Sequence, residues 1–169
     1  YFNLHWKTLI EFLDSKGCKI IFISNVDNDL TSYARKNNHE ILNLNISRSS
    51  LNLFSVIRDS LNIFKVLKDI KPDIVHSFYL KPSLLSLFSS VFLRKKIKFF
   101  FNITGLGFLG NSKSFKSKIL FFLTRKYFSF AINLKKNSKI ILETPFLKKY
   151  VATNFNIPER KISLISGVG

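Results

Sequence analysis

Residues 72–82 read Pro-Asp-Ile-Val-His-Ser-Phe-Tyr-Leu-Lys-Pro, and residues 98–107 read Lys-Phe-Phe-Phe-Asn-Ile-Thr-Gly-Leu-Gly. In each stretch a short apolar run stops abruptly at polar or glycine-rich residues, as a buried strand does where it enters a loop. A helical pattern separates the two stretches, and such alternation is typical of a parallel sheet, whose ligands bind beyond the carboxyl ends of the strands. The sequence therefore predicts that these loops form one rim, with His76, Lys81, Thr104, Gly105 and Gly107 gathered on it.

The same alternation extends through the chain. Apolar spacing predicts helices over residues 2–16, 29–37, 53–70, 83–93, 114–134 and 146–153, and strands over 19–24, 39–46, 73–77, 98–103, 139–143 and 161–165. The clearest amphipathic helix is 53–70, with Phe54, Ile57, Leu61, Phe64 and Leu67 on one stripe. The predicted fold class is α/β, a doubly wound, mostly parallel Rossmann-like sheet with helices on both faces.

The composition indicates one domain with a real core, since 46% of the 169 residues are hydrophobic. The single cysteine, Cys18, cannot form an internal disulfide, which favours a reducing cytoplasm. The chain begins with Tyr1 and contains no methionine, so we expect it to be a fragment of a longer protein.

The net charge of +17 has three possible sources: a nucleic-acid partner, an anionic membrane surface, or codon usage that favours lysine. No nucleic-acid-binding module is recognisable, which argues against the first. No stretch reaches the about 20 consecutive apolar residues that a spanning helix needs. The predicted helix 114–134 combines phenylalanine and leucine with basic residues, which suits an anionic bilayer surface as well as ordinary packing on the sheet.

Four stretches of the chain resemble the N-terminal domain of family 4 glycosyltransferases, and in particular bacterial enzymes that extend undecaprenyl-diphosphate-linked oligosaccharides. Residues 73–82 and 102–107 carry the resemblance on the rim, residues 2–9 are similar to the family's first helix, and residues 158–169 to its last strand and interdomain linker. The resemblance implies that residues 1–166 are the acceptor-binding domain and that 167–169 begin the linker. It also implies a first strand before Tyr1 and a separate C-terminal donor-binding domain.

The family further implies a retaining transfer of a sugar, such as an N-acetylhexosamine, from a UDP-sugar to a lipid-linked acceptor in bacterial surface glycan synthesis. Such enzymes have two Rossmann-like lobes, the GT-B architecture, and are cytoplasmic proteins peripheral to the inner face of the cell membrane. The nucleotide sugar is bound mainly by the C-terminal lobe, so this fragment alone is expected to be inactive. No cofactor is expected. No metal is expected either, because the His, Cys and acidic residues show no metal-ligand spacing.

His76 is the candidate catalytic residue. A neutral imidazole at a strand end can hold a sugar hydroxyl or a phosphate oxygen, although the residues alone favour a histidine that only bonds to backbone. The resemblance reverses that preference, but many relatives carry a second histidine where this chain has Phe78. An orienting role for His76 therefore fits better than a role as base.

The other candidates are assigned to substrate binding. Lys81 beside a helix N-terminus suits a diphosphate, or is one more surface lysine. Thr104, Gly105 and Gly107 would let backbone N–H groups approach a ligand, or simply form a tight turn. The resemblance adds three residues near the acceptor cleft or on the same rim: Asn3, His5 and Ser77. Glu143 ends another predicted strand on this rim, at a position where many relatives have Gln-Asn or a Ser.

A different reading of the same residues is a basic Rossmann-like binding module without enzymatic activity. Its partner would be nucleic acid or an anionic membrane surface.

Overall fold

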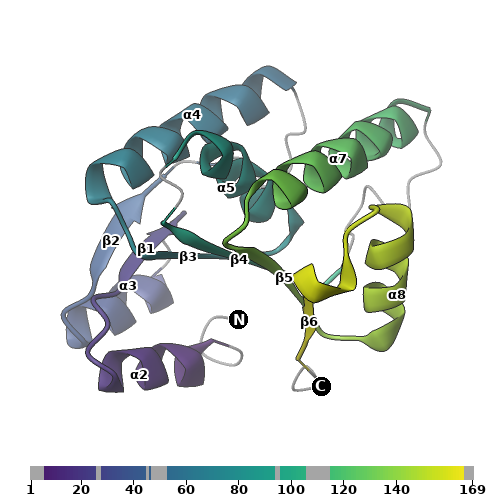
Figure 1. The fold of residues 1–169 in the computed structure, drawn as a ribbon. Coiled ribbons are helices and arrows are strands. Elements are labelled where there is room, and N and C mark those ends of the chain that lie inside the picture. The colour runs from purple at the N-terminus through teal and green to yellow at the C-terminus, as the bar shows by residue number, and fades with distance from the viewer. Residues whose placement is uncertain are drawn as a thin grey trace. The chain divides into compact units, whose positions relative to one another are not determined.

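The structure is a computed structural model that describes residues 6–25, 28–44, 46, 53–93, 96–105 and 115–165 (Figure 1). The chain divides into two compact units, which lie within residues 1–50 and 51–167. Each is built from alternating helices and parallel strands, so the predicted parallel α/β fold class is confirmed. The described strands form two separate sheets, β1-β2 and β3-β4-β5-β6.

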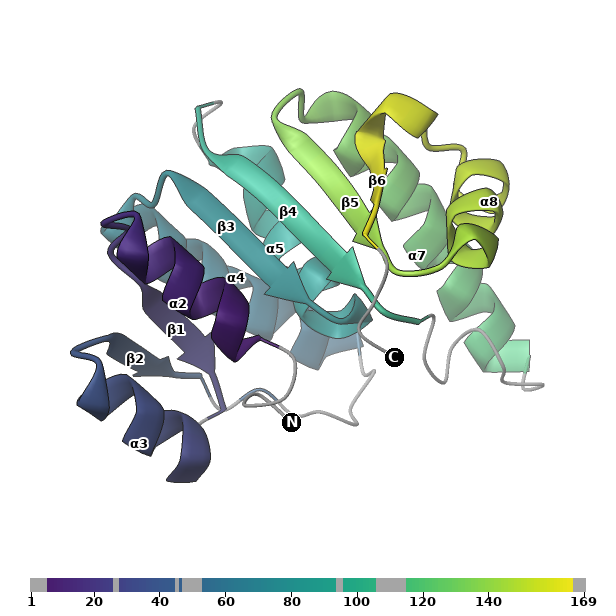
Figure 2. The same cartoon turned by 90° about the horizontal axis from the view of Figure 1, so that it is seen from below.

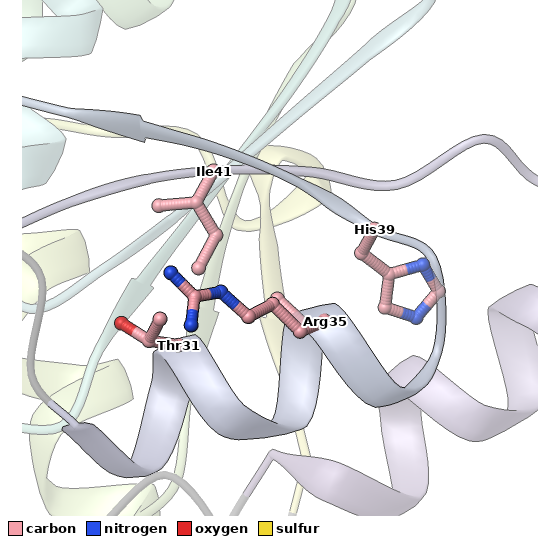
Figure 3. Close-up of a pocket in the computed structure, with 5 residues that line it drawn as sticks. Thr31, Arg35, His39 and Ile41 are labelled. Carbon is pink, nitrogen blue, oxygen red and sulfur yellow. The ribbon is translucent and has the colours of Figure 1, made fainter.

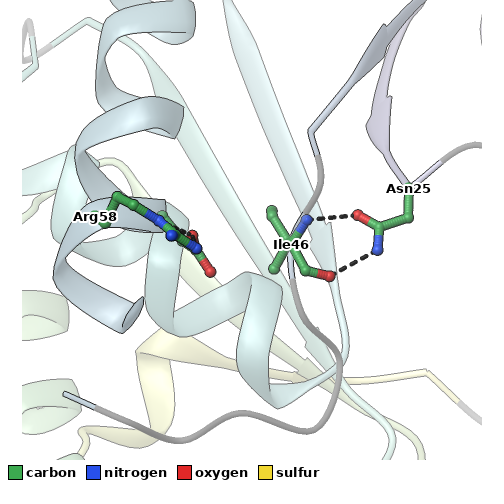
Figure 4. Close-up of polar contacts among 4 residues, drawn as sticks. Asn25, Ile46 and Arg58 are labelled. Atoms are coloured by element: carbon green, nitrogen blue, oxygen red, sulfur yellow. Dashed lines mark hydrogen bonds and ion pairs between the residues drawn. The ribbon is translucent and has the colours of Figure 1, made fainter. Parts of the chain in front are cut away.

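The first unit contains a two-stranded parallel sheet. Its elements are α2 (Lys7–Ser15), β1 (Ile21–Ser24), α3 (Asn28–Lys36) and β2 (Glu40–Asn43). Asn25 extends the pairing beyond the end of β1: its side-chain Nδ2 donates to the Ile46 carbonyl at 2.6 Å, and Ile46 N donates back to Oδ1 at 2.8 Å (Figure 4). The Asn25 side-chain amide thereby takes the place of a backbone amide in the ladder. It pairs the N–H and the carbonyl of Ile46, which lie beyond the last paired residues of the two strands.

The second unit contains a four-stranded parallel sheet in the order β3-β4-β5-β6. Its elements are α4 (Leu53–Ile70), β3 (Ile74–Phe78), α5 (Leu80–Phe92), β4 (Lys98–Ile103), α7 (Phe115–Leu134), β5 (Ser138–Leu142), α8 (Pro145–Asn154), the short 3-10 helix η1 (Glu159–Lys161) and β6 (Ile162–Leu164). In the register Phe78 lies opposite Asn102, and Ile103 opposite Leu142.

One face of this sheet forms the core of the second unit. Alternate residues of β4 and β5 are fully buried, among them Phe101 and Ile140, and helices α5 and α7 lie on this side (Figure 2). The Phe101 ring meets the edge of the Phe128 ring of α7, with 6.3 Å between centroids. Because side chains alternate between the faces of a strand, Phe100 and Asn102 point to the opposite side.

Four sequence predictions need correction. Strand β2 ends at Asn43 rather than at residue 46. Strand β3 ends at Phe78 rather than at residue 77, and α5 begins at Leu80 rather than at residue 83. Pro82 does not start the helix but lies in its first turn, where a missing N–H is harmless.

No described helix is long and apolar enough to cross a bilayer.

The predicted apolar stripe of α4 is wrong in its first half. Phe54 is largely exposed, whereas Asp59 and Ser60 are buried. Helix α5 contacts α4 through small side chains, and Ser89 Oγ donates to the Ser60 carbonyl at 3.3 Å. Small side chains let two helices pack closely, because the interhelical distance depends on the side chains at the contact. The buried side of α4 therefore includes Asp59 and Ser60.

Candidate functional site

The carboxyl ends of β3, β4 and β5 form one edge of the sheet, because the three strands are parallel neighbours. Tyr79, Thr104 and Glu143 directly follow these strands. Lys81 lies in the first turn of α5 at the same edge, and Gly105 follows Thr104. Of the predicted rim, Lys81, Thr104, Gly105 and Glu143 are therefore brought to this edge, whereas His76 lies within β3 and not at its end. Asn3, His5 and Gly107 lie outside the described residues.

His76 is the third residue of β3 and lies two residues before the strand ends. Its ring stacks on Phe78, with 4.3 Å between centroids, and lies 6.0 Å from the ring of Phe100. Burial among these rings lowers the pKa of His76 to about 4, because the imidazolium loses its hydration. Its Nε2 is buried and has no hydrogen-bond partner within the described part of the chain. At neutral pH the side chain is thus an uncharged imidazole with an open polar atom.

Asn102 provides a second open polar atom on the same face of the sheet. It lies opposite Phe78 in the register, so it shares the face of Phe78 and His76. The side chain is only 4% exposed, and its Oδ1 has no partner among the residues described. An unsatisfied buried polar atom costs about 1–3 kcal/mol, and a ligand group that binds there would remove that cost.

The sequence prediction missed Asn102 as a site residue. The available signal was a single amide inside the apolar run Phe-Phe-Phe-Asn-Ile, where a strand residue on a buried face is normally apolar.

Tyr79 has a backbone conformation that side chains rarely adopt. Its φ of 70° and ψ of 163° fall in a region that is essentially reserved for glycine. Two backbone hydrogen bonds stabilise this strained conformation. Tyr79 N donates to the Asn102 carbonyl at 2.8 Å, and the Tyr79 carbonyl accepts from Ser83 N at 3.1 Å. Residues of this kind cost about 1–3 kcal/mol and cluster at functional sites. Nothing in a tyrosine marks such a position in sequence.

Lys81 lies within the electrostatic field of a buried carboxylate. Burial lowers the pKa of Lys81, and the negative charge of Asp59 on α4 partly offsets that shift. Asp59 is 2% exposed; its Oδ1 accepts from the Arg58 guanidinium at 3.1 Å and 3.3 Å, while Oδ2 finds no partner among the described residues. The sequence analysis gave no role to Asp59, because it lies on a helix and far from the rim in sequence.

For two predicted substrate-binding residues, Ser77 and Gly105, the local structure gives no sign of a ligand. Ser77 points to the opposite face from His76, where it is buried and its Oγ lies 2.6 Å from the Ser86 Oγ of α5. This contact gives no support to the predicted role of Ser77 in substrate binding. Gly105 has no positive φ, and a Cβ atom there would meet nothing within 4 Å in the described part of the chain. Neither the backbone conformation nor the packing at position 105 therefore requires a glycine.

A separate pocket of about 280 Å³ lies in the first unit (Figure 3). Thr31, Ala34 and Arg35 of α3 line it together with His39 and Ile41. It contains none of the predicted site residues. Within the described ranges, no group of His, Cys, Asp and Glu side chains is arranged to hold a metal ion.

The comparisons with known proteins agree with this fold. Residues 1–144 match the family described as Glycosyl transferase 4-like. Among solved structures, the crystal structure of a glycosyltransferase from Rickettsia africae ESF-5 is similar, with a TM-score of 0.64 and 21% identity. The similarity covers 92% of this chain but only 36% of that one, so this chain spans about a third of its length. No curated protein matches the chain. Since the family match spans most of the sequence, the chain belongs to the glycosyl transferase 4-like family.

Proposed function

We propose that this chain is the acceptor-binding part of a retaining glycosyltransferase that moves a sugar from a UDP-sugar to a lipid-linked acceptor. The proposed donor sugar is an N-acetylhexosamine, and the proposed product belongs to a bacterial surface polysaccharide or glycan. In this reaction the bond from the sugar C1 to the UDP oxygen breaks and a bond to an acceptor hydroxyl oxygen forms. The hydroxyl proton passes to the departing UDP oxygen, and UDP is released. A second domain would bind most of the nucleotide.

The observation that carries the proposal is the pair of open polar atoms on one sheet face, His76 Nε2 and Asn102 Oδ1, in a chain of this family. Both belong to side chains that can hold a hydroxyl group, because a neutral imidazole and an amide each offer a donor and an acceptor. The apolar rings of Phe78 and Phe100 beside His76 offer a flat surface for a sugar or a lipid.

Within this proposal His76 orients the acceptor and does not remove its proton. An imidazole with a pKa of about 4 is a weak base at neutral pH, and general bases work best when their pKa lies near the working pH. Lys81 contributes positive charge at the rim, where the acceptor's diphosphate would lie. The enzyme would act as a peripheral protein at the cytoplasmic face of the cell membrane.

The test is transfer of radiolabelled sugar by the full-length protein in membrane fractions. A panel of UDP-sugars is offered with undecaprenyl-diphosphate-linked acceptors, for wild type, His76→Ala, Asn102→Ala and Lys81→Ala. We expect a drop of about tenfold or more for each variant, since loss of one hydrogen bond to a bound group costs about 1–2 kcal/mol. Lys68→Ala is the matched control for Lys81→Ala, because Lys68 is an exposed lysine in the last turn of α4 and outside the rim, and it should retain transfer.

A further variant tests the loop after β4. Gly105→Ala adds a methyl group that meets none of the described residues within 4 Å. We expect unchanged stability and reduced transfer, because a ligand bound at the rim would meet the added methyl group. Unchanged transfer in every rim variant would discard this site, whereas no transfer from any donor, with salt-sensitive binding to nucleic acid, would favour a non-enzymatic binding module.

A further inference from the structure

Helix α7 is apolar on two opposite sides. One side is fully buried, with Phe128, Ala131 and Ile132. The other side exposes six large apolar side chains to between 46% and 77%: Phe115, Ile119, Phe122, Leu123, Phe130 and Leu134. Their spacing places them on one face of the helix, together with the exposed Lys118 and Lys126. We name these eight residues the outer face of α7.

An apolar surface of this kind is unusual on a soluble domain. Contiguous exposed apolar patches mark sites of contact with proteins or membranes, whereas single exposed residues are normal. The packing of α7 on the sheet does not account for the six side chains, because the helix already buries its other side there. Exposure of this extent indicates a surface of contact.

The charged residues of α7 itself are all basic. The sequence contains no Asp or Glu from Ile74 to Leu142, and α7 lies within this stretch. Lys126 Nζ lies 5.6 Å from the centre of the Phe122 ring, a distance at which a cation is attracted to an aromatic face. A second copy of the same face would bring like charges together, whereas an anionic surface complements both the lysines and the apolar side chains.

A small pocket adjoins the outer face and is also basic. Its volume is about 80 Å³, and Phe122, Arg125, Lys126 and Ser129 of α7 line it together with residues 154–156. The Arg125 guanidinium donates to the Asn154 carbonyl at 2.7 Å through Nε, which holds the α7 side of the pocket against the end of α8. The Ser129 Oγ donates to the Asn156 carbonyl at 3.4 Å, so the pocket adds positive charge beside the outer face, while Arg125 and Ser129 already donate to backbone carbonyls.

We propose that the outer face of α7 docks on an anionic lipid bilayer. Its apolar side chains would enter the headgroup region, and Lys118 and Lys126 would contact lipid phosphates. A helix that follows a strand and precedes a parallel one runs opposite to both, so the first turns of α7 lie at the rim end of the sheet (Figure 2). Docking would thus bring the rim close to the membrane surface. The choice of a bilayer as partner rests in part on the proposed function, in which the acceptor is a lipid.

The experiment is co-sedimentation of the full-length protein with vesicles of phosphatidylcholine alone and of phosphatidylcholine with one quarter phosphatidylglycerol. We expect wild type to bind the anionic vesicles more tightly, with a strong dependence on salt. Phe122→Ser with Lys126→Gln should weaken that binding by about tenfold or more, because it removes one inserted ring and one cation.

The matched control is a second Phe-Lys pair with the same spacing. Phe12 on α2 and Lys16, which directly follows that helix, are also four residues apart, and Lys16 Nζ lies 5.5 Å from the centre of the half-exposed Phe12 ring. Phe12→Ser with Lys16→Gln should leave vesicle binding unchanged. Because all four substitutions are at exposed positions, thermal melting of both variants should match wild type.

Three outcomes would overturn the proposal. Wild type does not bind anionic vesicles, both double variants lose vesicle binding equally, or neither double variant loses it. Self-association of wild type that is lost only in the α7 variant would assign the face to a second copy instead. Vesicle binding is measured without any sugar donor, so its failure is distinguishable from failure of the proposed transfer reaction.

Discussion

At position 76, burial rather than a neighbouring charge sets the protonation of the imidazole. The pKa of His76 falls from 6.5 to about 4 because the ring lies among Phe78, Phe100 and the sheet. No charged group contributes to this shift, so the pKa of His76 does not depend on the protonation of a neighbouring side chain. Hydrogen bonding by His76 in the site is therefore expected to be constant from neutral pH down to about pH 5.

This pKa predicts acid sensitivity of the fold. Between pH 6.5 and about 4 the unfolded chain holds a proton on His76 that the folded chain does not, so stability falls as the pH falls through this window. Wild type should lose about 2 kcal/mol more than His76→Phe between pH 7.5 and pH 5, because each pKa unit corresponds to about 1.4 kcal/mol. Urea denaturation of both proteins at the two pH values measures the difference. Parallel pH profiles would contradict the burial of a neutral imidazole.

Tyr79 carries strain that glycine would relieve. At ordinary positions, Gly is less stable than Ala by about 0.5–1 kcal/mol. With φ at 70°, this order should reverse: Tyr79→Gly should be more stable than Tyr79→Ala by about 1–2 kcal/mol, as both lack the ring and only Ala keeps the strained Cβ. Chemical denaturation of the two variants tests this. An Ala variant as stable as the Gly variant would show that the backbone relaxes without cost.

At the scale of elements, lysines from elsewhere in the chain satisfy the ends of two helices. Lys161 Nζ donates to the carbonyls of Ile132 and Lys136 at 3.0 and 3.2 Å, and it also contacts the Lys135 carbonyl, all at the end of α7. Lys135 Nζ donates to the Leu93 carbonyl just after α5, at 3.2 Å. The last carbonyls of a helix lack partners and carry partial negative charge, so an ammonium group stabilises them.

Removing the first of these contacts should loosen the second unit. Lys161→Met keeps the length and the apolar stem but leaves the carbonyls at the end of α7 without that donor. We expect a loss of about 1–3 kcal/mol, the usual cost of unsatisfied groups that are partly buried. Lys139→Met is the control, since Lys139 is exposed on β5, and it should stay within about 0.5 kcal/mol of wild type. Thermal melting of both variants decides between the two results.

At the scale of the whole molecule, the strands form two ladders rather than one. Among the described strands β3 pairs only with β4, and β1 only with β2. A parallel strand that is buried on its faces normally has neighbours on both edges. The family resemblance supplies a candidate for such a neighbour, namely a strand that precedes Tyr1 in sequence.

This proposal predicts a gain in stability on extension of the chain. A version that begins about 15 residues upstream should melt at a temperature higher by about 5 °C or more, because an added strand buries apolar area and pairs exposed backbone groups. Differential scanning calorimetry of the two versions is the measurement. Equal melting temperatures would discard the idea of an additional strand.

Much of the fold was predictable because it depends on local periodicity. The bounds of α4 and β4 match the predicted 53–70 and 98–103, and those of α7 and β5 differ by one residue. The start of α5 was not predictable in the same way, because Leu80 and Lys81 before a proline resemble loop as much as first turn. For the site, the grouping of Lys81, Thr104 and Glu143 at one edge followed from strand order alone.

The sequence by itself determined the parallel α/β class, the order of helices and strands, and the basic charge of α7. These properties depend on residue order and on periods of two and 3.6 residues, which neighbours along the chain establish. Only the tertiary structure decided that His76 and Asn102 share a face while Ser77 bonds to α5, that Asp59 is buried beside Lys81, and that Tyr79 is strained. Each of these results depends on packing between segments far apart in sequence. The free energy of that packing overrides the preference of any single residue.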